Sequence, residues 1–297
     1  MTISTFFRMM LVLFAVALIG LQAGAAAYTI TDLGSFGIGY TFPTAINNCG
    51  QVVGGSFVDL QTEHPFLYSD GVFHDLGTLG GANALATAIN DHGDIVGYSA
   101  IASAPYSSAH AFLYSGGVMN DLGTNGNYTS EATGINKHGQ IVGNYGQYSF
   151  IYQNGQFQSL GTEHLLQTKV TGINNHGEAV GYFYGDNFPS NDGYHAFTYL
   201  NGTFTDIGKL GGSVWGLAYA INDAGQVAGT AWGNGGFIEG ASLYAAGISQ
   251  VFGGSIARGV NNSGVVVGQT LQGPSQGDHA FVYQDGHYQD LNSLIDP

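Results

Sequence analysis

Short runs that alternate apolar and polar residues follow one another through residues 28–297, separated by turns that contain glycine. In one representative stretch, this alternation predicts four strands at residues 85–90, 94–99, 110–115 and 118–122. The turn between the first two strands reads Asn-Asp-His-Gly. Asparagine at its first position and glycine at its fourth are typical of a hairpin with a type I turn and a bulge. The pattern therefore predicts an antiparallel meander of four strands.

The four-strand pattern occurs six times, and each copy carries an Asn-x-x-Gly motif in its first turn. The asparagines of this motif are Asn47, Asn90, Asn136, Asn174, Asn222 and Asn261. A mean spacing of about 43 residues matches one four-stranded blade of a β-propeller. A solenoid is the structural alternative, but its repeats are typically shorter and its strands parallel, whereas these turns require antiparallel pairing. We therefore expect an all-β propeller of six four-stranded blades.

Two sets of residues indicate how each blade is oriented. A small residue precedes each Ile-Asn or Val-Asn pair, which places the first strand innermost, where strands crowd around the propeller axis. These residues are Ala45, Ala88, Gly134, Gly172, Ala220 and Gly259. The third strands carry large residues that we expect to fill the space between blades, namely Phe66, Phe112, Phe150, Phe197 and Phe281. The fifth copy lacks the histidine and phenylalanine of this strand, so its pattern specifies the pairing less well.

Histidine opens the third strand in four of the six copies, as His64, His110, His195 and His279. Equivalent positions in neighbouring blades are too far apart to share a zinc ion, whose nitrogen ligands lie about 2.0–2.1 Å away. We expect each histidine to hydrogen-bond a local backbone group instead. A repeated hydrogen bond that fixes the end of the fourth strand is expected from Asp32, Asp75, Asp121, Asp206 and Asp290.

Residues 1–27 differ from the rest of the chain. Arg8 is their only charged residue, an apolar run covers residues 9–21, and three alanines end at Ala27. These features are typical of a secretory signal peptide that is cleaved before Tyr28. An uncleaved membrane anchor is the alternative, since the run is slightly shorter than the about 20 residues of a membrane span. We expect a secreted or periplasmic protein in which residues 28–297 form one propeller domain without membrane insertion.

The charge of residues 28–297 limits the classes of partner. Twenty acidic residues face only Lys137, Lys169, Lys209 and Arg258, which leaves a net charge of −16. Four dispersed cations cannot neutralise a nucleic-acid backbone, and an anionic membrane surface is disfavoured for the same reason. Cys49 is the only cysteine, so an internal disulfide is excluded, and its position in the repeat predicts a solvent-facing turn. We expect a monomer.

The loop between the second and third strands varies in length and is long at residues 98–109 and 182–194. Propeller geometry places these loops on the same face as the crossings between blades, and variable loops on a rigid scaffold are a usual location for recognition. The expected ligand-binding residues are Tyr98, Tyr106, Tyr182, Tyr184, Phe188, Tyr194 and Trp232, with Asp59, Asp186 and Asp192 among them. Alternatively, these aromatic rings only pack their own loops. No cofactor is expected, because the one candidate calcium loop, residues 185–193, lacks the spacing of a known calcium-binding loop.

The stretch "HAFLY" from His110, together with "DLGTLGG" and "ATAINDHGDIVG" within residues 75–97, resembles the bacterial extracellular HAF repeat family, named after His-Ala-Phe. The resemblance covers essentially all of residues 28–297. It implies an exported, propeller-like repeat protein and no established activity. Proteins of this kind often continue into another repeat after a phrase such as "HYQDLN", so a seven-bladed ring with a missing or incomplete blade is the alternative to six.

The phrase "YTITDLG" at residues 28–34 has the pattern of a fourth strand without the three strands before it. We expect it to pair near the C-terminal repeat and latch the ring, because an N-terminal strand there would cover an exposed sheet edge.

Sequence motifs give little support to an enzyme. Propeller sialidases need several arginines, and Arg258 is the only one after export. Neither a G-x-S-x-G nor an H-E-x-x-H motif is present. The predicted function is a non-catalytic exported binding or surface-structural module for an extracellular glycan or protein. The alternative is an extracellular carbohydrate-active hydrolase that uses a pair of acidic residues, since such a spatial pair cannot be recognised in one sequence.

Overall fold

A computed structural model describes residues 31–38, 40–102, 108–126, 129–160, 167–185, 193–212, 214–233, 238–253, 255–271 and 278–294. Within these residues the chain forms 24 strands and one short 3-10 helix, η1 (Leu291–Leu294). The signal peptide expected at residues 1–27 lies outside the described residues. Among the described residues, no helix is long and apolar enough to cross a membrane.

The strands form six groups of four. The first sheet contains β1 (Thr41–Ile46), β2 (Val52–Phe57), β3 (Glu63–Ser69) and β4 (Val72–Asp75). The second contains β5 (Gly80–Ile89), β6 (Ile95–Ile101), β7 (Ala109–Ser115) and β8 (Val118–Gly123). The third contains β9 (Glu131–Ile135), β10 (Ile141–Tyr145), β11 (Tyr148–Gln153) and β12 (Gln156–Ser159).

The remaining three sheets follow the same plan. The fourth contains β13 (Lys169–Ile173), β14 (Ala179–Tyr184), β15 (Tyr194–Leu200) and β16 (Thr203–Gly208). The fifth contains β17 (Trp215–Ile221), β18 (Val227–Trp232), β19 (Ile238–Ala245) and β20 (Ile248–Phe252). The sixth contains β21 (Ser255–Val260), β22 (Val266–Leu271), β23 (Asp278–Gln284) and β24 (His287–Asp290).

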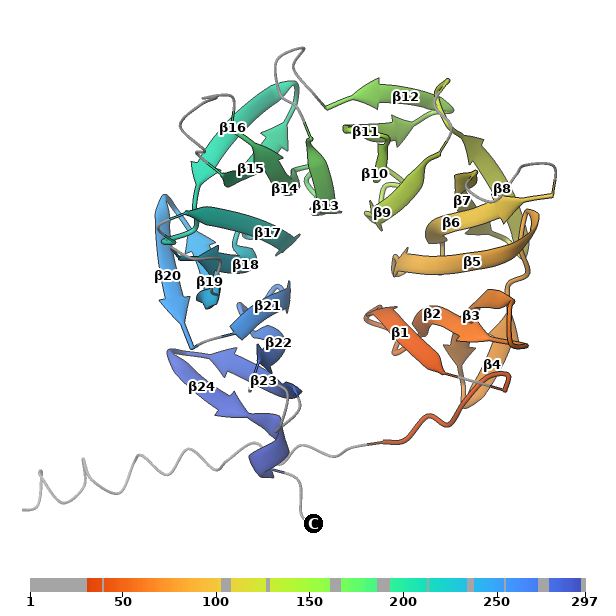
Figure 1. Cartoon of the computed structure of the whole chain (residues 1–297), viewed down its shortest axis with the longest axis horizontal. Helices are drawn as coiled ribbons and strands as arrows, with labels where there is room; N and C mark the ends of the chain where they lie inside the picture. The colour runs from red at the N-terminus through yellow and green to blue at the C-terminus, as the bar shows by residue number, and fades with distance from the viewer. Residues whose placement is uncertain are drawn as a thin grey trace, which may run out of the picture.

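Each group is an antiparallel meander in which consecutive strands pair. The six sheets surround a central space, and the first strand of each sheet lies nearest to it (Figure 1). The first two sheets are also joined by one parallel bridge between Glu63 and Asn83. The fold is therefore a β-propeller of six four-stranded blades, and the predicted class is confirmed. The fifth sheet pairs in the same way as the others despite its divergent third strand.

The turns between first and second strands have the predicted geometry. In the second sheet, the Gly93 N–H donates to the Asn90 carbonyl at 3.1 Å, and the Asn90 N–H donates to the Asp94 carbonyl at 3.0 Å. Gly93 has a φ of 82°, a conformation that disfavours every residue with a Cβ atom. Cys49 lies in the equivalent turn of the first sheet and is exposed, as predicted.

Small residues on the innermost strands allow neighbouring sheets to approach closely. A Cβ atom on Gly134 of β9 would lie 3.4 Å from the Cα atom of Gly172 on β13 and 3.1 Å from the Val142 side chain. Any larger side chain at Gly134 would therefore displace its neighbours. This contact confirms that the small residue of each repeat marks the strand next to the propeller axis.

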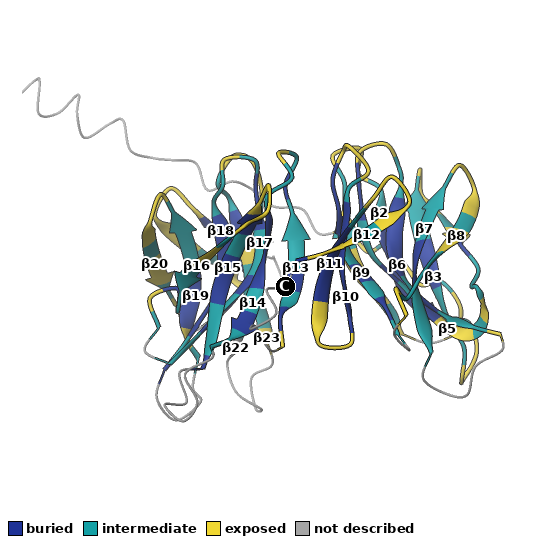
Figure 2. Ribbon diagram, turned by 90° about the horizontal axis from the view of Figure 1, so that it is seen from above, coloured by how far each residue is buried: buried dark blue, intermediate teal, exposed yellow. Residues whose placement is uncertain are grey.

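The core lies between consecutive sheets. The five third-strand phenylalanines predicted to fill this space are at most 1% exposed. Between the first two sheets, for example, Val53 and Leu67 pack with Ile89, Ile95 and Phe112. Buried residues lie within the sheets and exposed residues concentrate at the turns (Figure 2). Each of the second to fifth sheets thus buries one face against the sheet before it and the other against the sheet after it.

The ring is open between the first and sixth sheets (Figure 1). The latch expected from residues 28–34 is wrong for the part that the structure describes, because residues 31–34 form no strand. Residues 28–30 lie outside the described residues. The physical reason is that a fourth strand needs a third strand as its partner, and β23 of the sixth sheet already pairs with β24.

Candidate functional site on the loop face

The two ends of the ring differ in what they present. The Asn-x-x-Gly turns lie at one end. The other end, here called the loop face, carries the connections between second and third strands and the crossings from one sheet to the next. Five predicted ligand-binding residues are described, and they lie on β6, β14, β15 and β18: Tyr98, Tyr182, Tyr184, Tyr194 and Trp232. Tyr106, Phe188, Asp186 and Asp192 lie outside the described residues.

Four of these five residues belong to one continuous row of rings. The Tyr194 ring lies between two other tyrosines: its centroid is 5.5 Å from that of Tyr182 and 5.3 Å from that of Tyr184. Its ring is also 6.0 Å from Trp215, which in turn lies 5.7 Å from Trp232. We call Tyr182, Tyr184, Tyr194, Trp215 and Trp232 the aromatic row. Their edge-to-face and tilted arrangements are the favoured ones for aromatic pairs.

Trp215 was not among the predicted residues. The prediction considered only loops between second and third strands, whereas Trp215 begins β17 directly after a crossing between sheets. Crossings reach the same face of the ring, so a search that included them would have found this tryptophan. All five residues of the aromatic row are half-buried.

A glycine fixes the middle of the aromatic row. A Cβ atom on Gly193 would lie 2.0 Å from Cδ1 of Trp215, and Gly193 has a φ of +83°. The Gly193 carbonyl also accepts a hydrogen bond from the Gly185 N–H at 3.1 Å, which closes the base of the loop between β14 and β15. The hydroxyl of Tyr194 donates to Oε1 of Gln167 at 3.3 Å. The Trp215 ring is therefore held against backbone that no larger residue could occupy.

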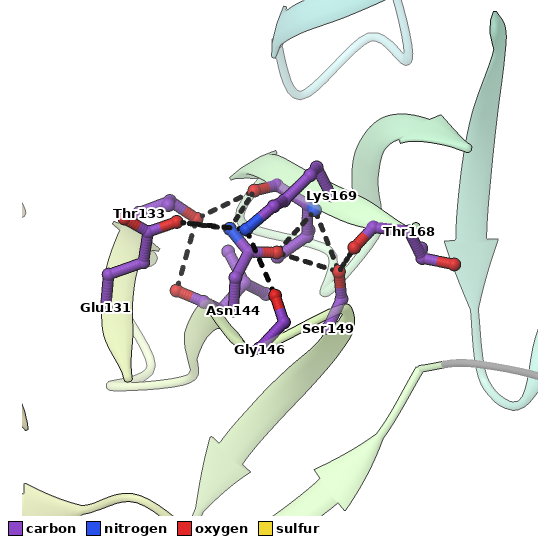
Figure 3. Close-up of polar contacts among 9 residues, drawn as sticks. Glu131, Thr133, Asn144, Gly146, Ser149, Thr168 and Lys169 are labelled. Atoms are coloured by element: carbon purple, nitrogen blue, oxygen red, sulfur yellow. Dashed lines mark hydrogen bonds and ion pairs between the residues drawn. The ribbon is translucent and has the colours of Figure 1, made fainter. Parts of the chain in front are cut away.

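Beside the aromatic row lies a pocket of about 200 Å³, here called the polar pocket. Its lining residues are Tyr98, Ala109, Thr129, Ser130, Glu131, Asn144, Gly146 and Lys169. The Lys169 Nζ atom lies 3.6 Å from a carboxylate oxygen of Glu131 and donates to the Gly146 carbonyl at 3.5 Å (Figure 3). The polar pocket thus combines a carboxylate, an ammonium group and backbone carbonyls.

Asn144 joins three strands around the polar pocket by hydrogen bonds. It is 3% exposed, and its Nδ2 donates to Glu131 Oε1 at 3.2 Å and to the Val170 carbonyl at 3.1 Å (Figure 3). Its Oδ1 accepts from the Val170 N–H at 3.0 Å and from the buried Ser149 hydroxyl at 2.8 Å. Asn144 thus links the Glu131 carboxylate to the backbone of β13 through one side chain.

The register of the strands shows that the charged pair is specific to two sheets. Glu131 lies opposite Asn144, and Lys169 lies opposite Tyr182. The same position on the other innermost strands is apolar, with Phe42, Leu85, Leu217 and Ile256. Because Lys169 lies opposite Tyr182, the polar pocket adjoins the aromatic row, and together they extend over the second to fifth sheets.

Two tyrosines in this site have perturbed acidity. Burial raises the pKa of Tyr98, and the nearby carboxylates of Glu63 and Glu131 raise it further. Burial likewise raises the pKa of Tyr182, with additional contributions from Tyr219, Tyr194 and Glu131. Both phenols therefore stay protonated at neutral pH and can donate hydrogen bonds to a ligand.

Glu63 is a second carboxylate near Tyr98 that the sequence did not single out. Burial raises the pKa of Glu63 above its ordinary value. A Cβ atom on Gly55 would lie 2.4 Å from Glu63 Oε1, so the carboxylate occupies space that a side chain at Gly55 would fill. Gly55 and Tyr98 hold equivalent positions on β2 and β6. Asp59, in contrast, accepts hydrogen bonds from the Gln61 and Thr62 N–H groups of its own loop, both at 2.8 Å.

The four third-strand histidines correct one expectation. Each pairs with an aspartate carboxylate of the fourth strand rather than with a backbone group, at Nδ1–Oδ distances of 2.7 to 2.9 Å. The pairs are His64 with Asp75, His110 with Asp121, His195 with Asp206, and His279 with Asp290. The expectation failed because the third strand opens beside the end of the fourth, where the carboxylate lies.

The aspartates do fix the strand ends as predicted. The carboxylate of Asp121, for example, accepts from the Gly123 N–H at 2.7 Å. Within the described part of the chain, no group of three or more metal-ligating side chains comes together. The candidate calcium loop, residues 185–193, falls outside the described residues except for its two end glycines.

The opposite end of the ring is a weaker candidate. There the Asn-x-x-Gly turns surround a cavity of about 290 Å³. Many of its polar groups already bind one another across sheets: the Asn48 side chain, for instance, donates to Asp91 Oδ2 at 2.8 Å, and Asn175 Nδ2 donates to Asp223 Oδ2 at 3.0 Å. These groups already make hydrogen bonds between sheets, so fewer of them are available to bind a ligand than on the loop face.

No protein-family model matches the sequence, and no curated protein matches it either. Among solved structures, the β-propeller domain of the Trilobed protease from Pyrococcus furiosus, described as having an open velcro topology, matches with a TM-score of 0.60. The match covers 86% of this chain and 85% of that chain at 12% identity. At this identity the likeness establishes the fold alone, which defines the chain as a β-propeller protein.

Two larger proteins match with lower scores. An acylaminoacyl peptidase from Pyrococcus horikoshii gives a TM-score of 0.52 at 12% identity, with 86% of this chain and 44% of that chain covered. TolB from Acinetobacter baumannii gives 0.51 at 12% identity, with 80% and 62% covered. The chain thus spans less than two thirds of the length of these two proteins.

Proposed function

We propose that this chain is an exported, non-catalytic binding module of the HAF repeat type, and that its loop face binds an extracellular glycan. The observation that carries the proposal is the aromatic row leading into the polar pocket. Partly exposed tyrosine and tryptophan rings offer large apolar faces at low cost in side-chain entropy. A sugar ring presents an apolar face of C–H groups together with hydroxyls, so it matches a row of rings beside fixed hydrogen-bonding groups.

The polar pocket supplies directional contacts to such a ligand. The Glu131 carboxylate accepts hydrogen bonds, the Lys169 ammonium donates them, and the Tyr98 phenol donates one. Glu131 and Lys169 neutralise each other at 3.6 Å, so the site favours a neutral, hydroxyl-rich ligand over a strongly charged one. A pocket with a few fixed polar groups beside aromatic walls is the usual form of a small-ligand site.

The test is a glycan-array and pull-down screen of residues 28–297 with three matched variants. Tyr194→Ala removes the centre of the aromatic row, and Lys169→Met removes the ammonium but keeps the apolar stem. Tyr288→Ala, on the outermost strand of the sixth sheet, is the control because it removes a partly exposed ring away from the loop face.

We expect each loop-face variant to weaken glycan binding by about tenfold or more, since a lost anchor typically costs 1–2 kcal/mol or more. The control should bind like the parent, and thermal melting should show that all variants are folded. Glycan binding that survives both loop-face substitutions contradicts the proposal. Capture of a protein with no glycan binding would replace the glycan by a protein partner.

One observation favours the hydrolase alternative. Burial raises the pKa of Glu63, as a general acid requires, while the Glu131 carboxylate lies 3.6 Å from the Lys169 Nζ atom. The charges of both carboxylates raise the pKa of Tyr98, so both lie near the same phenol. Release of reducing sugar from a panel of polysaccharides, lost in both Glu63→Gln and Glu131→Gln, would establish this activity. An absence of turnover by the parent on every polysaccharide removes it.

A further inference from the structure

The same apolar contact joins every pair of consecutive sheets, and on the sixth sheet the residue that would make this contact is exposed. A second-strand residue packs against the next sheet in each of the first five sheets and is 0% exposed: Val53, Val96, Val142, Val180 and Ala228. The equivalent residue of the sixth sheet, Val267, is 46% exposed. The third strand shows the same contrast, because Ala111, Ala196 and Ala241 are 0% exposed whereas Ala280 is exposed.

A hydrogen bond that joins the other consecutive sheets is also missing at the sixth sheet, among the described residues. In the first five sheets, the turn asparagine donates from Nδ2 to the backbone carbonyl of the next turn asparagine, as from Asn136 to Asn174 at 3.1 Å and from Asn222 to Asn261 at 2.8 Å. Asn261 is the last of the series. Among the described residues, its Nδ2 has no such carbonyl, although its Oδ1 caps its own turn like the others.

The first sheet is open on the opposite side. Ile46 is 67% exposed, whereas at the equivalent position Ile89, Ile135 and Ile221 are 8–9% exposed and Ile173 and Val260 are half-buried. Val52 is only half-buried, although its equivalents in the other five sheets are at most 1% exposed. The two sides of the opening thus display the two complementary halves of the interface that joins all other sheets.

The N-terminal segment carries the turn that ends a fourth strand in other sheets. Asp32 Oδ1 accepts from the Gly34 N–H at 2.8 Å, and Gly34 has a φ of 81°. Asp121 and Gly123 make the same turn at the end of β8, with 2.7 Å and 81°. In that sheet the aspartate also pairs with a third-strand histidine, whereas the described residues provide no histidine for Asp32. The end of a fourth strand is therefore preformed without the strand that it should pair with.

From these four observations, we propose that the open side of the ring is a docking site for one further unit of the same repeat, presented by a partner polypeptide. The unit comprises three antiparallel strands with the pattern of β1 to β3. Its turn asparagine carbonyl accepts from Asn261, its apolar faces cover Val267 and Ile46, and its third-strand histidine pairs with Asp32. This inference goes beyond the proposed function and does not depend on the loop face.

A single repeat fits this position better than a second copy of the whole chain. If the first sheet of a second copy docked on the sixth sheet, its five following sheets would continue around the same axis. They would meet the space that the sheets of this chain already occupy. The occupant is therefore a unit with a free end.

The experiment uses residues 41–69 of this chain as the repeat unit, because they carry Asn47, Val53 and His64 in the required spacing. In one arm the unit is tethered after Pro297, and in the other it is presented on a carrier protein. The host is either the parent or its Val267→Lys variant. A scrambled unit of the same composition is the control for tethering.

We expect the tethered unit to raise the Tm of the parent by about 5 °C, since 1 kcal/mol corresponds to about 2–4 °C in a domain of this size. In the host without the unit, Val267→Lys should leave the Tm nearly unchanged because Val267 is exposed, whereas Val180→Lys should lower it strongly. In the tethered host, Val267→Lys should abolish the gain. The carrier should be captured by the parent and not by the Val267→Lys variant.

Two results overturn the proposal. One is a tethered unit that leaves the Tm unchanged or a carrier that is not captured. The other is a stable dimer of the parent that Val267→Lys dissociates, since a second copy would then be the occupant. Neither result bears on glycan binding by the loop face, so the two proposals fail independently.

Discussion

In the first five sheets, the asparagine of the Asn-x-x-Gly turn makes hydrogen bonds both within its own sheet and to the next one. Asn136 is 2% exposed, and its Oδ1 accepts from the N–H groups of His138 at 3.0 Å and Gln140 at 3.1 Å. Its Nδ2 donates to the Asn174 carbonyl at 3.1 Å. One side chain therefore shapes a turn and connects two sheets, which explains why no other residue replaces asparagine in the six copies.

We expect Asn136→Ala to lower the free energy of unfolding by about 2–3 kcal/mol, because it removes several hydrogen bonds and leaves buried groups without partners. Urea denaturation monitored by circular dichroism measures this loss. Asn261→Ala is the control, since Asn261 Oδ1 accepts the same two bonds from its own turn, whereas no carbonyl of a following sheet among the described residues accepts from its Nδ2. Asn136 Nδ2 also donates to Gln140 Oε1 at 2.7 Å, a bond that Asn261 lacks because Val265 stands at the corresponding position. The control should lose about 1 kcal/mol less. Equal losses for both variants would show that the bond between sheets contributes nothing.

At the scale of elements, hairpin turns of neighbouring sheets hold one another. The carboxylate of Asp91, in the turn between β5 and β6, accepts from the Asn48 side chain at 2.8 Å and from the Asn48 N–H at 2.9 Å. Asn48 lies in the equivalent turn of the first sheet. These two hydrogen bonds lower the pKa of Asp91 below its ordinary value of 3.8. The contact therefore depends on an ionised carboxylate.

A lowered pKa in the folded state contributes stability that is present above the unfolded pKa and is lost as the pH falls through the folded one. We expect the parent protein to have a higher urea midpoint than the Asp91→Asn variant. The difference between the two midpoints should not change with pH near neutrality. This difference should shrink below pH 3.8 as Asp91 becomes protonated.

Asp70→Asn is the control for this pH dependence. It makes the same change in charge in the turn between β3 and β4, where the one hydrogen bond that Asp70 accepts from a described residue comes from the adjacent Ser69 hydroxyl. If the advantage of the parent over Asp91→Asn persisted unchanged to about pH 2, the charge of Asp91 would not hold these turns together.

At the scale of the whole molecule, the six sheets form an open array in which each sheet packs only against its neighbours. In such an array, stability is approximately the sum of the stability of each repeat and of the interfaces between adjacent repeats. The first and sixth sheets have one interface each, and the other four have two. The open ring therefore predicts weaker terminal sheets.

Native-state hydrogen exchange followed by mass spectrometry tests this expectation. Peptides from β9 to β16 should exchange more slowly, by about tenfold or more, than peptides from β1 to β4 and from β21 to β24, because terminal sheets open without breaking a second interface. Equal protection in all six sheets would contradict the open array and would indicate that the ring unfolds as a closed unit.

The amino-acid sequence by itself determined the repeat, the four strands of each copy, their antiparallel order and the innermost strand. These features depend on residues a few positions apart: the alternation of apolar and polar residues, and the asparagine and glycine of each turn. Even the divergent fifth copy follows the pattern, because its Asn222 turn is intact. The sequence also indicated most of the aromatic row, since loop length and aromatic content are visible along the chain.

Only the tertiary structure decided which residues of different sheets meet. Glu131 and Lys169 lie on separate innermost strands, Glu63 covers Gly55, and Trp215 completes the aromatic row from a crossing between sheets. Such contacts depend on how far each sheet is rotated relative to the one before it, and no local pattern encodes that rotation. The latch expected from residues 28–34 failed in its described part because β23 already pairs with β24. Whether the ring closes could not be predicted from the sequence either, because six similar repeats look alike whether or not their rotations add up to a closed ring, and the described residues leave it open.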